Sequence, residues 1–240
     1  MRVPTSKFQN AFGKYLKHVQ TGEEVIVTKN GKGVAKLIRY SDPLIHLVKE
    51  GASDYEISKY MTYQDFLEVS ESSDSRYELI DGEIFLLSSP KRKHQVAVSE
   101  ILGQMYIYFR GKTCRPLTAP FDVRLYNDAG CFEDDPNVVQ PDVLVICDHE
   151  NIDERDTYQG IPSLVVEVLS SSSRSKDLIK KMRLYVNSNV PEYWAVDPDN
   201  KNITVYEIID RKIERTSTYR YGEIIESFYF EDLMVSTENM

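Results

Sequence analysis

Two short apolar stretches of this chain each contain a single carboxylate. Asp142 follows Pro141 within residues 138–146, and Glu167 lies within residues 164–169. Short runs so rich in Val, Ile and Leu predict buried strands, in which an isolated carboxylate is costly unless a positive group compensates it. Mg²⁺ suits this place, because it takes oxygen ligands and is often held by one or two carboxylates together with substrate phosphate. The alternative is a structural carboxylate that an arginine, backbone N–H groups or water satisfies.

The flanking patterns predict the elements that must position these carboxylates. Thr62 and Asp65 form a capping-box pattern that opens a short helix. The Asp81-Gly82 pair is a hairpin signal, which places Glu78 on the first of two paired strands. The other predicted elements are helices at about 91–110 and 174–187, and strands at 77–80, 83–87, 120–126, 138–146, 164–169, 192–196, 203–209 and 212–218.

The charge of the chain is divided unevenly along its length. Residues 1–52, here called the head, hold nine Lys/Arg and four Asp/Glu, a balance of +5. The rest of the chain holds 20 Lys/Arg and 34 Asp/Glu, a balance of −14. Attraction to phosphate is therefore expected to begin at the head, and the acidic excess of residues 61–240, here called the body, suits a metal-binding enzyme or simply a soluble protein.

The head has its own helix and hairpin signals. Apolar residues at helical spacing precede a strand at 24–28, an Asn30-Gly31 turn and a return strand at 34–38. A short second helix is expected from Asp42 to about Gly51. Because about 50 residues bury little surface, a homodimer is expected. The apolar residues of the first helix are Phe8, Phe12, Leu16 and Val19.

Composition excludes several classes of protein. No stretch of the 240 residues is apolar enough to span a bilayer, and the N-terminus lacks the core of a signal peptide, so no membrane partner and a cytoplasmic location are expected. Cys114, Cys131 and Cys147 show no CxxC spacing and predict neither a disulfide framework nor a zinc site.

Five segments of the head form a recognisable set: SKF at 6–8, FGKYL at 12–16, GEE at 22–24, IVTKNGK at 26–32 and VAKL at 34–37. With these segments the head closely resembles the N-terminal domain of the Phd/YefM antitoxin family. The resemblance implies a dimer that binds operator DNA, and Arg2, Lys7 and Lys14 match in character the basic residues that touch phosphates. The alternatives are a solvated basic face on a dimerisation module and a module that pairs with a toxin or a sibling protein.

Six groups of residues in the body form a recognisable set: YELIDGE at 77–83, HQ at 94–95, QPDV at 140–143, VEVLS at 166–170, the spaced residues Asp177, Lys181 and Tyr185, and VPEYWAVDP at 190–198. With these residues the body resembles the Uma-type putative restriction endonuclease family of the PD-(D/E)XK nuclease superfamily. The fold class implied is α+β or α/β. An antitoxin-like domain at 1–52 and a linker at 53–60 would precede a restriction-endonuclease-like core at 61–240, with a central mixed sheet flanked by helices.

The resemblance implies a catalytic role for four residues. Asp142 and Glu167 would hold Mg²⁺ or Mn²⁺, with Glu78 as a third metal ligand. The lysine of the motif is expected at 169, where this chain has leucine, and Lys181 on the following helix fits best as its replacement. Lys180 is the second candidate, and an ordinary helix-surface lysine paired with Asp177 is the alternative.

His94 and Gln95, at the start of the long helix, would contact substrate phosphate, or His94 would support Glu78; a helix cap is the alternative for the histidine. The leading hypothesis is a metal-dependent DNA endonuclease with a DNA-binding, dimerising head. The competing hypothesis is an operator-binding regulator or antitoxin-type interaction protein with an inactive body. The sequence does not distinguish a DNA from an RNA substrate.

Overall fold

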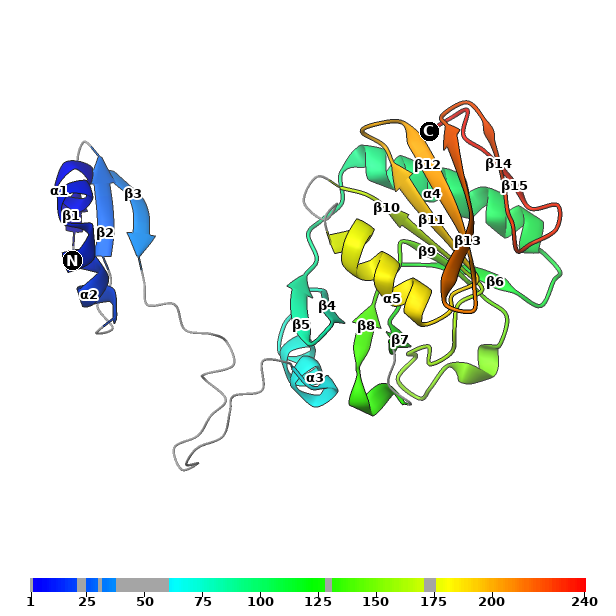
Figure 1. Cartoon of the computed structure of the whole chain (residues 1–240), viewed down its shortest axis with the longest axis horizontal. Helices are drawn as coiled ribbons and strands as arrows, with labels where there is room; N and C mark the ends of the chain where they lie inside the picture. The colour runs from blue at the N-terminus through cyan, green and yellow to red at the C-terminus, as the bar shows by residue number, and fades with distance from the viewer. Residues whose placement is uncertain (1, 21–24, 30–31, 38–60, 128–130, 171–175) are drawn as a thin grey trace. The chain divides into compact units, whose positions relative to one another are not determined.

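The computed structural model describes residues 2–20, 25–29, 32–37, 61–127, 131–170 and 176–240 (Figure 1). The chain divides into two compact units, Met1–Ile57 and Ser58–Met240. The head lies within the first unit and the body within the second, and each is described by itself. The predicted second helix of the head and the predicted linker fall outside the described residues.

The described part of the head combines two helices with a three-stranded sheet (Figure 1). The predicted hairpin is confirmed, because β2 and β3 pair antiparallel. A further strand, β1, pairs parallel with β2 and was not predicted, since three residues are too few to show an alternating pattern. The elements are β1 Arg2–Pro4, α1 Thr5–Asn10, α2 Phe12–Gln20, β2 Val25–Lys29 and β3 Lys32–Leu37.

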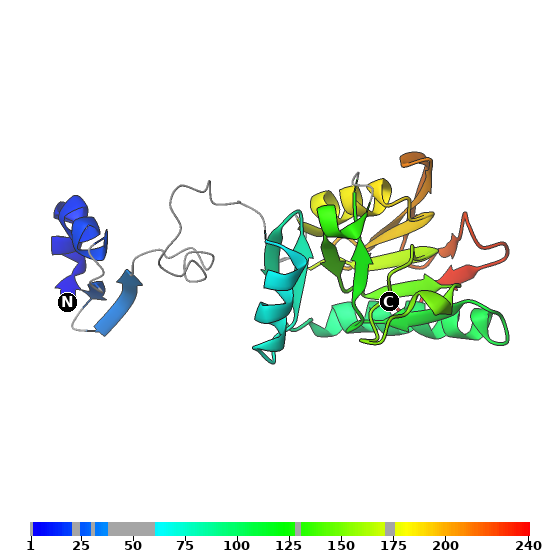
Figure 2. The same cartoon turned by 90° about the horizontal axis from the view of Figure 1, so that it is seen from below.

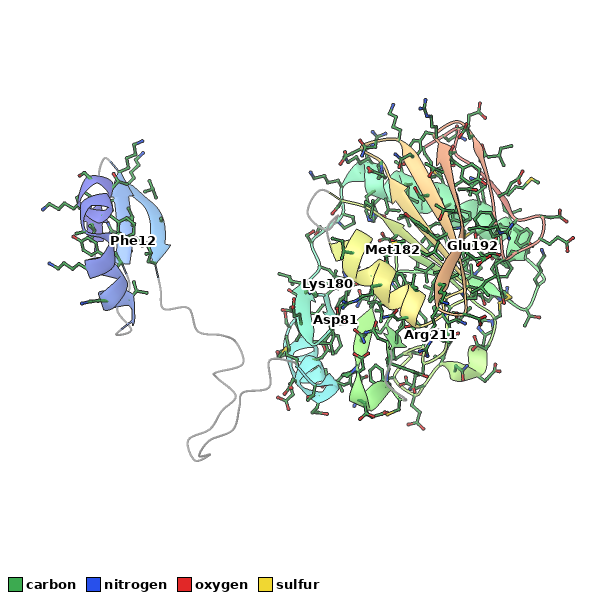
Figure 3. All side chains as sticks on the ribbon, viewed as in Figure 1. Phe12, Asp81, Lys180, Met182, Glu192 and Arg211 are labelled. Atoms are coloured by element: carbon green, nitrogen blue, oxygen red, sulfur yellow. A yellow bond between two sulfur atoms is a disulfide. The ribbon has the colours of Figure 1, made fainter. Side chains whose placement is uncertain are left out.

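The helix of the head is interrupted, which changes its predicted apolar stripe. Ala11 leaves helical geometry (φ −139°, ψ 35°), and a second helix starts at Phe12. Phe12, labelled in Figure 3, is consequently 49% exposed, while the buried Tyr15 stacks on Phe8 with ring centroids 5.9 Å apart. The side chain of Leu16 lies outside the described set. The buried hydrophobic residues among the described part of the head are Val3, Tyr15, Val19, Val25 and Val27.

The body is built on a mixed six-stranded sheet in the order β13-β12-β11-β10-β9-β6. Only β10 and β11 run parallel, and the other neighbours are antiparallel. A four-stranded sheet, β5-β4-β8-β7, and a small β14-β15 ribbon complete it. The strands are β4 Tyr77–Ile80, β5 Glu83–Leu86, β6 Arg115–Thr118, β7 Val123–Leu125, β8 Asn137–Val139, β9 Val143–Ile146, β10 Leu164–Val168, β11 Glu192–Asp197, β12 Asn202–Ile209, β13 Lys212–Arg220, β14 Ile224–Glu226 and β15 Met234–Ser236.

Helices cover both faces of the six-stranded sheet, which confirms the predicted fold class. Figure 2 shows α4 and α5 on opposite sides of the sheet. Alternation along β9 explains this arrangement, because Val143 packs in the cluster with α4 whereas Leu144 packs in the cluster with α5. No helix in the described ranges is long and apolar enough to cross a membrane. The helical segments are α3 Tyr63–Glu71, α4 Arg92–Phe109, η2 Phe132–Asp134, η3 His149–Asn151, η4 Lys176–Lys181 and α5 Met182–Asn187.

The predicted strand at 138–146 is wrong as a single element. It is divided into β8 and β9, which belong to different sheets, with Gln140 to Asp142 between them. Pro141 has no backbone N–H to donate to a neighbouring strand, so strand pairing is interrupted at this residue, between β8 and β9. Asp142 therefore lies immediately before β9 rather than inside a continuous strand.

Two other predicted boundaries change. The strand predicted at 120–126 is limited to β7, and β6, which precedes Pro120, was not predicted and forms an edge of the central sheet. The predicted helix at 174–187 is present as η4, a π-helical segment, followed by α5.

The expectation that the cysteines form no disulfide is wrong for one pair. Cys114 and Cys147 are joined by a disulfide with a Cα–Cα distance of 4.0 Å. Arg115 pairs with Ile146 across β6 and β9, so the two cysteines meet at the adjoining ends of neighbouring strands. Sequence spacing did not reveal this, because the pairing depends on β6, which was not predicted.

Candidate active site

The polar and charged residues of the body that were singled out from the sequence gather at one cavity of about 980 Å³. They come from five places in the body: β4, the start of α4, the β8–β9 turn, β10 and η4. The predicted residues that line the cavity are Glu78, His94, Gln95, Asp142, Glu167, Lys180 and Lys181.

Strand pairing brings Asp142 and Glu167 together. Val143 on β9 pairs with Val166 on β10 in an antiparallel register, so the next positions outward on the two strands are Asp142 and Glu167. Neighbouring positions of this kind have side chains on the same face of a sheet. The two carboxylates predicted to act together are therefore adjacent.

Two groups hold the carboxylate of Asp142. Its Oδ2 accepts a hydrogen bond of 2.8 Å from the backbone N–H of Val168 and lies 3.1 Å from His94 Nε2. The hydroxyl of Thr118 donates to its backbone carbonyl at 2.8 Å. Contacts from β10, α4 and the end of β6 therefore hold Asp142 in one orientation.

Lys181 bridges the other two acidic residues. Its Nζ lies 2.7 Å from Glu78 Oε1 and 2.8 Å from Glu167 Oε1. All three residues are buried, with Lys181 3% exposed and Glu78 fully covered. The Tyr185 hydroxyl donates to the same oxygen of Glu167 at 2.6 Å. Burial, and then the neighbouring charge of Glu167, hold the pKa of Tyr185 well above its ordinary value, so the hydroxyl remains a donor.

Two polar residues of this site were missed from the sequence. The backbone N–H of Gln140 donates to Glu78 Oε1 at 3.0 Å, and its side-chain amide donates to Asp122 Oδ1 at 2.9 Å. Burial raises the pKa of Asp122. Gln140 stands beside the Pro141-Asp142 pair and could have been found by that proximity, whereas nothing local distinguishes Asp122.

The two candidate lysines occupy different environments. Lys181 contacts both Glu78 and Glu167, whereas Lys180, labelled in Figure 3, pairs with Glu83 at 2.7 Å on the surface. Adjacent helical residues point about 100° apart, which accounts for the difference. The side chain of Asp177, the predicted surface partner of Lys181, lies outside the described residues.

His94 and Gln95 differ in exposure. His94 is buried and contacts Asp142 rather than supporting Glu78, and its Nδ1 has no hydrogen-bond partner among the described residues. Because a buried N–H without a partner is costly, the ring proton belongs on Nε2, where it can be donated to Asp142. Gln95 is exposed at the cavity.

The carboxylates of the cavity could supply some, but not all, of the ligands of a hard divalent cation. In the ranges that the structure describes, no three His, Cys, Asp or Glu side chains are grouped so that they could hold a metal ion by themselves. Two adjacent carboxylates are enough for Mg²⁺ when water and substrate phosphate supply the other ligands. Asp142 and Glu167 fit that requirement because they occupy adjoining positions of neighbouring strands. Lys181 contacts both Glu167 and Glu78, and Glu78 also accepts from the Gln140 backbone.

The three predicted DNA-contacting residues of the head are all exposed. Arg2 lies on β1, Lys7 on α1 and Lys14 on α2.

Comparison with known proteins agrees with the two-part organisation. Residues 1–43 match the family described as antitoxin Phd_YefM, type II toxin-antitoxin system. A crystal structure of a putative nuclease belonging to DUF820 from Anabaena variabilis has the same fold, with a TM-score of 0.58 and 18% identity over 75% of this chain and 96% of that one. An uncharacterized Synechocystis protein, slr1290, is 27% identical over 146 residues, which are 60% of this chain and 72% of that protein.

Residues 63–234, most of the chain, match the family Uma2, described as putative restriction endonuclease. With the mixed sheet and the grouped acidic residues, this match confirms the predicted relationship. The chain belongs to the Uma2 family of putative restriction endonucleases.

Proposed function

We propose that the body is a Mg²⁺- or Mn²⁺-dependent endonuclease that hydrolyses DNA phosphodiester bonds. The observation that carries the proposal is the placing of Asp142 beside Glu167 at one cavity, with the Lys181 ammonium 2.8 Å from Glu167. Two carboxylates can hold a divalent cation, and a nearby ammonium can stabilise the charge that develops on the phosphoryl oxygens during hydrolysis.

Asp142 and Glu167 would hold the cation, which when bound lowers the pKa of a water molecule and stabilises charge on the phosphoryl oxygens. His94 and the Val168 amide keep Asp142 in a fixed orientation. Lys181, already beside Glu167, would orient the attacking water or counter the developing charge.

Cationic and amide side chains of the same cavity would bind the substrate backbone. Arg76 and Lys91 line it together with the exposed Gln95. We assign Gln95 to phosphate contact, and His94 to the support of Asp142, which its geometry favours over direct contact with substrate.

The head would add affinity for DNA and hold two copies of the chain together. Exposed Arg2, Lys7 and Lys14 would neutralise phosphates, and each neutralised phosphate releases counterions. A homodimer is proposed because the head buries only a small core of its own. The antitoxin match also favours a toxin or sibling protein as a second partner of the head.

A second candidate is an operator-binding regulator whose body is inactive. The observation that favours it is the match of residues 1–43 to an antitoxin family. The two candidates differ in their products, because a regulator binds duplex DNA without breaking it.

Labelled duplex DNA, single-stranded DNA and RNA of one sequence, incubated with the full chain and Mn²⁺, test the proposal. We expect cleavage of DNA that stops when EDTA is added. Tight binding of the duplex with no cleavage of any substrate would support the regulator instead.

A further inference from the structure

Glu78 contacts two other segments of the body through one of its carboxylate oxygens. Its Oε1 lies 2.7 Å from Lys181 Nζ and accepts a hydrogen bond of 3.0 Å from the backbone N–H of Gln140. The residue is fully buried on β4. The same oxygen thus joins a charged side chain on η4 to a backbone amide in the β8–β9 turn.

These two contacts lead to the metal-binding pair from opposite sides. Lys181 extends the link to Glu167, whose Oε1 lies 2.8 Å from the ammonium. Gln140 precedes Asp142 by two residues in the turn that delivers the aspartate to the sheet. Glu78 is therefore placed to influence the position of both carboxylates, through Lys181 and through the β8–β9 turn.

A metal ion shared by Glu78 and Glu167 conflicts with these contacts. An ammonium stands between Glu78 and Glu167, at 2.7 Å and 2.8 Å from their Oε1 atoms, so a cation shared by the two glutamates would have to displace it. Within the described parts of the chain, no three acidic or imidazole groups are arranged around one metal position. Mg²⁺ does not need a third carboxylate when water and phosphate complete its shell.

We infer that Glu78 is a positioning residue, which holds Lys181 against Glu167 and anchors the turn that carries Asp142, and that it is not a ligand of the catalytic metal. This inference rests on the proposed nuclease function. It replaces a three-carboxylate metal site with a two-carboxylate site and a glutamate–lysine clamp.

Metal affinity separates the two roles of Glu78. Mn²⁺ binding to the full chain is measured by calorimetry without nucleic acid, for the wild type and for the variants E78Q and E167Q. Glutamine at 78 keeps an oxygen for the Gln140 amide. We expect E78Q to weaken Mn²⁺ binding clearly less than E167Q does, because E78Q changes a partner of the ligands whereas E167Q removes a ligand itself.

The matched control is E192Q. Glu192 is an equally buried glutamate on β11 that does not line the cavity, and its variant should bind Mn²⁺ as the wild type does. An affinity loss in E78Q equal to that in E167Q, with E192Q unchanged, would overturn the inference while leaving the nuclease proposal standing.

Kinetic coupling provides the second readout. Cleavage rates at saturating Mn²⁺ are compared for E78Q, K181M and the double variant. A residue that acts through Lys181 should lose its effect once the lysine is gone, so the double variant should be no slower than K181M alone. If the double variant is instead slower than K181M by the factor that E78Q alone shows, Glu78 acts independently of Lys181, and the inference is overturned. A wild type that neither binds Mn²⁺ nor cleaves would refute the nuclease proposal, and the inference with it.

Discussion

The buried lysine is the most sensitive point of the body. Lys181 is only 3% exposed. Replacing it with methionine removes the ammonium that lies between the carboxylates of Glu78 and Glu167 and leaves both carboxylates buried without it. Breaking a buried ion pair by removing one partner costs about 3–5 kcal/mol. That is a large part of the roughly 5–15 kcal/mol by which a typical protein is stable. For a domain of this size it corresponds to a fall in Tm of about 6–20 °C.

Lys180 is the matched control, because it is the next residue and also contacts a glutamate. The side chains of this pair are 30% exposed at Lys180 and 56% exposed at Glu83, so solvent screens the pair and Lys180→Met should cost no more than about 1 kcal/mol. Thermal unfolding of both variants, followed by circular dichroism without metal, measures the difference. Adding Glu78→Gln to Lys181→Met should restore part of the stability, because one buried charge is removed. Equal, small shifts for both lysines would refute the assignment of Lys181 to a buried ion-pair network.

Three other outcomes follow from the structure. Asp142→Ala should lower stability by about 1–3 kcal/mol in urea titrations, because the buried N–H of Val168 loses its acceptor; a variant as stable as the wild type would contradict that contact. Burial raises the pKa of Glu192 above its ordinary 4.5, so the neutral side chain stabilises the native state at low pH and this contribution is lost as pH rises through the native pKa. The stability of the wild type relative to Glu192→Gln should therefore fall as pH rises from about 4.5. A difference that stays constant with pH would contradict the raised pKa. Deleting residues 1–52 removes a +5 segment, so affinity for duplex DNA and its salt dependence should both decrease in gel-shift titrations, and unchanged affinity would mean that the body binds DNA by itself.

Local signals in the sequence predicted most elements of the body. The capping box of Thr62 and Asp65 is present in both directions, and the Asp81-Gly82 turn joins β4 and β5 as expected. These features depend on residues a few positions apart, so their physical causes are visible in the sequence itself. The adjacency of Asp142 and Glu167 was predicted from the resemblance to the nuclease superfamily.

What could not be predicted depends on pairing between distant segments. The apolar run at 138–146 reads as one strand, because nothing local shows that its two halves enter different sheets. The contact of His94 with Asp142 and the disulfide of Cys114 with Cys147 likewise join elements whose order in the sheet is set by the whole fold. The sequence could nominate these residues, but only the three-dimensional arrangement assigns their partners.

The most direct test of the account is nicking of supercoiled plasmid by the purified full chain. Asp142→Asn keeps an acceptor for the Val168 amide but removes the carboxylate charge that the cation requires. With Mn²⁺, the wild type and the buried control Glu192→Gln should convert supercoiled plasmid to nicked and linear forms, EDTA should stop the reaction, and Asp142→Asn should be slower by at least about a hundredfold. Nicking by Asp142→Asn at the wild-type rate, or nicking that persists in EDTA, would contradict a metal-dependent site built on this carboxylate pair.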